Sequence, residues 1–113
     1  MTDDTDNIDN LPLAEQFRII SGSWVDAEAA AALLEDTKSA VLSQKMLAVA
    51  TTAGSVSRAE MQVKASDDWI DHLHGINAAR KKANLLKVRR EYLKMKFSEW
   101  VSSAADERAR AGL

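Results

Sequence analysis

The sequence predicts an all-α protein: an antiparallel helical hairpin or coiled coil, preceded by a short helix, with a long C-terminal helix that overhangs its partner. Between residues 57 and 110 there is no proline and only one glycine, Gly75, and most residues are strong helix formers. The 113 residues contain four glycines and one proline in all, which argues against an all-β fold. A helix over residues 57–110 would be roughly 80 Å long. The rest of so short a chain cannot cover it, so the sequence predicts a partner.

Start and stop signals place the individual helices. Pro12 stands near the first position of one helix, where its missing N–H costs no hydrogen bond, and Gly22 is expected to end that helix. Ser57 and Glu60 form a capping box that opens the longest helix. The sequence therefore predicts one helical domain over residues 11–110, with helices over 11–20, 24–50 and 57–110 and a permitted kink near residue 75.

The two ends of the chain are expected to lie outside this domain. Residues 1–10 are acidic and too poor in apolar side chains to offset the entropy lost on ordering. They are predicted to form a disordered acidic tail, and residues 111–113 a frayed end.

The last part of the long helix carries two apolar stripes. The first has the a/d spacing of a coiled coil and consists of Leu85, Val88, Tyr92 and Met95. The second consists of Leu86, Leu93, Phe97 and Trp100. Two stripes on one helix indicate two neighbours, namely the hairpin partner and a second copy of the chain. The first stripe is therefore predicted to mediate self-association, most simply as a dimer.

A basic segment overlaps these stripes. Residues 80–96 hold one acid, Glu91, and eight bases: Arg80, Lys81, Lys82, Lys87, Arg89, Arg90, Lys94 and Lys96. These cations are candidate contacts to single- or double-stranded nucleic acid, because each one that meets a phosphate releases counterions. The alternative is a solvated or internally paired face, since the cations lie on several sides of the helix and their methylene stems can cover an apolar seam.

The three tryptophans, Trp24, Trp69 and Trp100, stand at helical positions where a large ring usually anchors packing. Trp100 lies at the end of an apolar stripe and next to the basic segment. It is therefore also the candidate anchor for a protein partner.

No pattern of catalytic or ligand-binding residues is present. There is no cysteine. His72 and His74 are two residues apart, about 200° around a helix, so they cannot share a metal ion as an i, i+4 pair does. The sequence predicts a protein that is not an enzyme and has no metal site and no cofactor. Since it shows no secretory signal and no membrane span, a cytoplasmic location is expected.

The stretch from Ala65 to Arg80, together with the stretch from Tyr92 to Trp100, resembles small all-helical proteins of phages and prophages. In those proteins an Arg/Lys-rich and Ala-rich helical run is followed by Phe or Tyr and by a Trp near the C-terminus. They are encoded among recombination and replication genes. The resemblance implies an accessory role in phage DNA metabolism in the host cytoplasm, with residues 80–96 as the contact strip, and it implies no catalytic residue.

Three functions remain as hypotheses at this stage, and the third of them is a structural virion component, which predicts higher-order assembly rather than a closed dimer. The first is a non-enzymatic accessory protein of phage DNA recombination or replication, which contacts nucleic acid or a protein bound to it. The second is a helical protein-interaction module, such as a phage-encoded inhibitor of a host protein, that does not bind nucleic acid. Steep salt dependence of binding would distinguish the first from the second.

Overall fold

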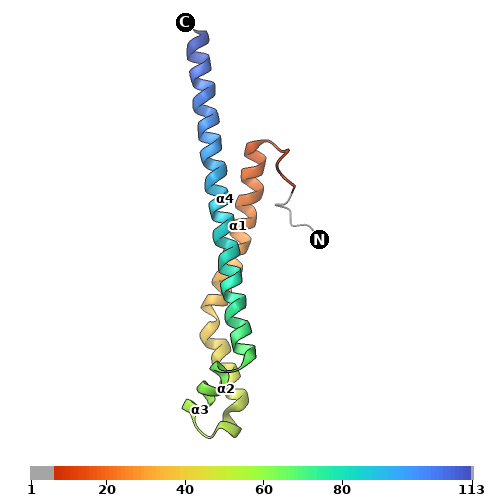
Figure 1. Cartoon of the computed structure of the whole chain (residues 1–113), viewed down its shortest axis with the longest axis vertical. Coiled ribbons are helices and arrows are strands. Elements are labelled where there is room, and N and C mark those ends of the chain that lie inside the picture. The colour runs from red at the N-terminus through yellow and green to blue at the C-terminus, as the bar shows by residue number, and fades with distance from the viewer. Residues whose placement is uncertain (1–6, 113) are drawn as a thin grey trace. The chain divides into compact units, whose positions relative to one another are not determined.

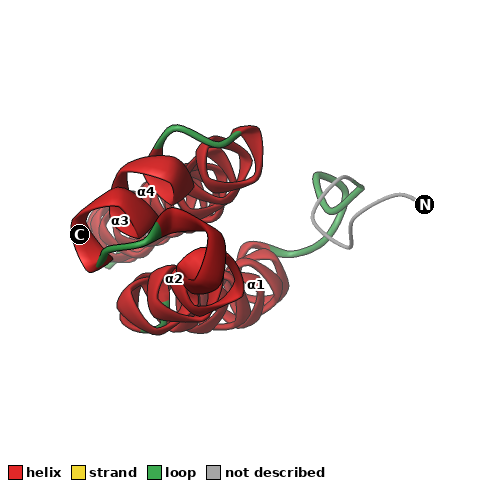
Figure 2. Ribbon diagram, turned by 90° about the horizontal axis from the view of Figure 1, so that it is seen from below, coloured by secondary structure: helices red, strands yellow, loops and turns green. Residues whose placement is uncertain are grey.

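The computed structural model describes residues 7–112, and within this range it contains four α-helices and no strand. Figure 2 shows the helices as the only regular elements of this part of the chain. The helices are α1 (Leu13–Asp36), α2 (Lys38–Ala53), α3 (Val56–Lys64) and α4 (Asp67–Ala111). Two compact units are present, and α1 and α4 contribute to both. The first unit is formed by the chain up to Ala27 and from Ala83 onward, and the second by Glu28–Lys82.

In the first unit, the N-terminal part of α1 packs against α4 in the antiparallel sense (Figure 1). Ile20 is completely buried, and it forms the core with Ile8 and Leu93. Partly buried apolar side chains surround this core, namely Leu13, Phe17 and Ile19. The predicted all-α hairpin with a long C-terminal helix is therefore confirmed.

In the second unit, α2 and α3 pack against each other across a tight turn at Gly54. Gly54 has φ +80°, a left-handed conformation that glycine adopts without a steric penalty. Ser55 follows and caps α3, because its Oγ accepts a hydrogen bond from the Arg58 N–H at 3.2 Å. The buried apolar residues of this unit are Ala31, Ala53, Ala59, Val63, Trp69 and Ile76.

The predicted helix end at Ser21 and Gly22 is wrong, because α1 continues through both residues to Asp36. Gly22 does not have a positive φ, and apart from its chain neighbours and the nearby backbone of its own helix no atom lies within 4 Å of the place where its Cβ would be, so nothing there requires a glycine. A glycine inside a helix costs about 1 kcal/mol relative to alanine. Burial of the neighbouring Ile20 stabilises the helix by more than that.

The helix predicted over residues 24–50 is divided at Thr37 into α1 and α2. Hydrogen bonds nevertheless cross the division, since the Thr37 N–H donates to the Leu33 carbonyl and the Val41 N–H donates to the Thr37 carbonyl. The Thr37 hydroxyl also donates to the Leu33 carbonyl, at 2.7 Å. Such back-bonding to residue i−4 competes with the backbone N–H and often bends a helix.

The helix predicted over residues 57–110 is interrupted, but at Ala65 and Ser66 and not at Gly75. Ser66 Oγ donates to the Val63 carbonyl at 2.6 Å and accepts from the Trp69 N–H at 3.2 Å, so this side chain ends α3 and caps α4. The capping residue of α3 is Ser55 and not the predicted Ser57.

The predicted disorder of residues 1–10 is wrong for residues 7–10. Ile8 is buried at 2 % exposure, and its carbonyl accepts a hydrogen bond from the Leu11 N–H. Residues 1–6 of the predicted tail, and residue 113 of the predicted frayed end, lie outside the described residues.

Candidate interaction surfaces

Arg90 is part of the packing between α1 and α4 in the first unit. Its Nε donates to Ser21 Oγ at 3.0 Å. The guanidinium carbon lies 4.9 Å from the ring centroid of Phe17 and 5.2 Å from that of Trp24. A planar guanidinium can stack on aromatic faces and hydrogen-bond at its edge at the same time. Arg90 therefore serves as a structural residue that holds three side chains of α1.

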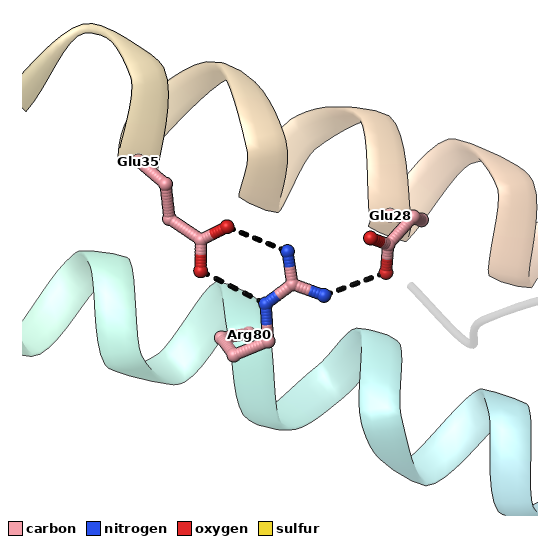
Figure 3. Close-up of polar contacts among 3 residues, drawn as sticks. All are labelled: Glu28, Glu35 and Arg80. Carbon is pink, nitrogen blue, oxygen red and sulfur yellow. Dashed lines mark hydrogen bonds and ion pairs between the residues drawn. The ribbon is translucent and has the colours of Figure 1, made fainter.

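Arg80 has a corresponding role in the second unit, where it joins α4 to two carboxylates of α1 (Figure 3). Its Nη1 donates to Glu28 at 2.7 Å, and its Nε and Nη2 donate to Glu35 at 2.9 and 2.6 Å. These charge-assisted bonds raise the pKa of Arg80, and the bond from Arg80 lowers the pKa of Glu35. The Arg80 guanidinium is thus already bound by carboxylates of its own chain.

The structure divides the predicted basic segment into cations used for folding and cations on the surface. Arg80 and Arg90 are held by contacts within the chain, as described above, and Arg89 is half-buried. The exposed cations are Lys81 and Lys82 in the second unit and Lys87, Lys94 and Lys96 in the first. The segment therefore contains no continuous row of eight available charges.

The second apolar stripe is buried along only part of its length. Leu86 and Leu93 are buried in the first unit, as expected for the stripe that faces the hairpin partner. Phe97 and Trp100 continue the stripe toward the C-terminus but are exposed, at 43 % and 61 %. Figure 1 shows α4 continuing past the N-terminal end of α1 in this unit. From residue 94 to residue 112 every residue is exposed except the half-buried Ala104.

This uncovered part of α4 carries apolar residues at the spacing i, i+3, i+4 and i+7. They are Phe97, Trp100, Val101 and Ala104, and we call them the terminal stripe. The rings of Phe97 and Trp100 lie 6.0 Å apart, centroid to centroid, with a tilt of 31°. Val101 and Ala104 were not predicted as interaction residues, although the helical period beyond Trp100 indicates both.

The predicted self-association residues form a separate face of α4, which we call the seam: Leu85, Val88, Tyr92 and Met95. All four are more than half exposed. At 100° per residue the centre of the seam lies about 130° around α4 from the buried Leu86 and Leu93. Lys96 covers one edge of it, with Nζ 5.5 Å from the centroid of the Tyr92 ring.

The Asp/His-rich start of α4 is part of the packing of the second unit. Trp69 is buried, and the His72 ring lies 5.6 Å from it, centroid to centroid. His72 Nε2 is buried and makes no hydrogen bond to any group of residues 7–112, whereas His74 is exposed. In the described part of the chain, no three His, Cys, Asp or Glu side chains are placed to hold a metal ion together.

The second unit also has an open apolar groove between α2 and α3. Met46, Leu47 and Ala50 line it from α2, and Val56 and Ala59 line it from α3. Leu47 and Val56 are both 75 % exposed. The groove was not predicted from the sequence, because it depends on the turn at Gly54.

No protein-family model matches the sequence, and searches of curated proteins and of solved structures give no significant match. None of the helices over residues 7–112 combines the length and apolar character required to span a membrane.

Proposed function

We propose that this protein is a non-enzymatic helical interaction module, and that its terminal stripe docks into an apolar groove of a partner protein. The observation that carries the proposal is the exposure of Phe97, Trp100 and Val101 on a part of α4 that no described helix of the first unit covers. Anchors at i, i+3, i+4 and i+7 on one helical face are the pattern by which amphipathic helices enter grooves.

The chemistry of the terminal stripe suits this role. Tryptophan is among the residues most enriched at binding hot spots, and aromatic side chains remove a large apolar area from water when they are buried. Full burial of one large apolar side chain contributes about 1.5–3 kcal/mol. Phe97 and Trp100 together would thus supply a substantial part of the binding free energy.

Replacing Phe97 and Trp100 with alanine is expected to remove partner binding and to leave the α1–α4 packing intact, since neither side chain is buried. The measurement is affinity capture of cell-lysate proteins on immobilised full-length chain, quantified by mass spectrometry. Circular dichroism would verify that the variant is folded.

The matched control is Glu99→Ala, which lies between the two anchors in sequence but on the opposite side of the helix. This control should retain the proteins captured by the unchanged chain. Equal capture by the Phe97/Trp100 variant would contradict the proposal.

A second candidate is the accessory role in phage DNA recombination or replication that the sequence resemblance implies. One observation favours it: Lys87, Lys94 and Lys96 remain exposed in the first unit, where each can meet a phosphate. Arg80 and Arg90 are not assigned to this contact, because binding a phosphate would require them to leave Glu35 and Ser21.

If the three lysines bind phosphates, replacing them with glutamine should weaken oligonucleotide binding and flatten its salt dependence. The slope of log K against log salt has a magnitude of about 0.7–0.9 per phosphate contact. Losing the contacts of all three lysines should therefore reduce the magnitude of the slope by up to roughly 2–3. Fluorescence anisotropy with single- and double-stranded oligonucleotides at two salt concentrations measures this. Lys38→Gln in α2 is the control for a general charge effect. No binding by the unchanged chain at low salt would eliminate this candidate.

A further inference from the structure

We propose that the seam binds a second copy of this chain, and that the two α4 helices pair in parallel and in register. The inference goes beyond the docking function, because the seam and the terminal stripe occupy different sides of α4. The sequence predicts self-association through these residues. The inference adds the orientation of the two helices and the charged residues that determine it.

Two properties of the first unit make the seam suitable for a second copy. First, the seam residues are all more than half exposed and lie about 130° around α4 from the buried Leu86 and Leu93, so α1 does not obstruct a helix that approaches the seam. Second, packing against α1 has already fixed the helical conformation of α4 along most of the seam. A short seam then suffices, since pairing does not have to pay for helix formation.

The heptad register identifies the residues that flank the seam. With Leu85 and Tyr92 at a and Val88 and Met95 at d, Glu91 falls at a g position and Lys96 at the following e position. In a parallel dimer these two positions of opposite chains are neighbours, so Glu91 of each copy meets Lys96 of the other.

Contacts within the chain are compatible with this pairing. Lys96 is already drawn over the Tyr92 ring, which holds its ammonium group at the edge of the seam. Glu91 is half-exposed, and its contact with Arg90 Nη1 is long, at 3.5 Å. Both groups can therefore form the pair between chains without breaking a short bond inside the chain.

In an antiparallel pair built on the same four residues, like charges of the two chains would face each other. The midpoint of this pair falls near residue 90, which brings Glu91 beside Glu91 of the second copy. Like charges directly opposed disfavour an arrangement, whereas opposite charges fix register and orientation. The charge pattern of α4 thus favours the parallel dimer.

Sedimentation equilibrium of the full chain tests self-association. The unchanged chain should form a concentration-dependent dimer, and a variant with Val88→Glu and Tyr92→Glu should remain a monomer with unchanged helicity, because both side chains are exposed. Ala105→Glu, on an exposed position beyond the seam, should dimerise as the unchanged chain does. A chain that is monomeric at every concentration, or that assembles beyond two copies, would overturn the proposal.

Charge exchange tests the orientation. Glu91→Lys alone and Lys96→Glu alone should each weaken the dimer at least tenfold, and the two changes together should restore it, because the pair is only inverted. In an antiparallel dimer Glu91→Lys would replace one like-charged pair with another and change little. That result, or a double variant as weak as the single variants, would reject the parallel arrangement.

Ser102→Cys, at the next d position after Met95, provides an independent measure of orientation, because the sequence contains no cysteine of its own. In the parallel dimer the two cysteines face each other and should form a disulfide under mild oxidation. A dimer by sedimentation in which this disulfide does not form would contradict the parallel orientation. Partner capture through the terminal stripe should persist in the Val88/Tyr92 variant, so the two proposals fail separately.

Discussion

Replacing Ile20 with alanine is expected to lower the free energy of unfolding by about 2–5 kcal/mol. Ile20 has no exposed surface and forms the core of the first unit with Ile8 and Leu93. The loss combines the transfer free energy of the removed methyl and methylene groups with the cavity left between α1 and α4. Urea denaturation followed by circular dichroism measures it.

Val25→Ala is the matched control for Ile20→Ala. Val25 lies in the same helix and the same unit but is 58 % exposed, so its truncation should change stability by no more than about 0.5 kcal/mol. Similar losses for the two variants would show that the packing of α1 on α4 does not stabilise the protein.

Arg90→Ala is expected to lower the free energy of unfolding by about 1–3 kcal/mol. This is more than the substitution of a surface cation usually costs. The variant loses the hydrogen bond to Ser21 and the stacking on Phe17 and Trp24. Arg90→Lys should restore little of this, because an ammonium group has neither the planar face nor the Nε–H. Thermal and urea denaturation measure both variants.

The control for Arg90 is Lys94→Ala, which removes a nearby cation that is exposed. It should leave the midpoint of unfolding almost unchanged. If Arg90→Ala and Lys94→Ala behave alike, Arg90 is a surface charge and the role assigned to it in packing is wrong.

The sequence was sufficient for the helical class, the hairpin and the long final helix, because these depend on local propensity and on the positions of glycine and proline. It was misleading at Gly22, where a glycine continues a helix that burial of Ile20 stabilises. It also failed at Ser66, although a serine followed by Asp67 and Asp68 is a recognisable helix start. The unbroken run of helix formers around Ser66 concealed that signal.

The candidate sites show a similar division. The two stripes follow from the helical period, and the structure leaves the seam exposed while it buries Leu86 and Leu93 of the second stripe. The cations are different, because charge and spacing do not distinguish Arg80 from Lys81. The difference is that Arg80 lies beside Glu28 and Glu35, which are 52 and 45 residues away in sequence. Such distant pairing requires the tertiary structure.

The exposure of residues 94–112 has a further consequence for affinity. With little tertiary packing to support it, helix in this segment depends on the intrinsic propensities of its own residues. A partner that recognises the terminal stripe binds only the helical fraction, so the apparent dissociation constant increases as that fraction falls. Substitutions at Ser102 and Ser103, which lie outside the stripe, can therefore adjust binding strength through pre-organisation alone, without altering any atom that the partner touches.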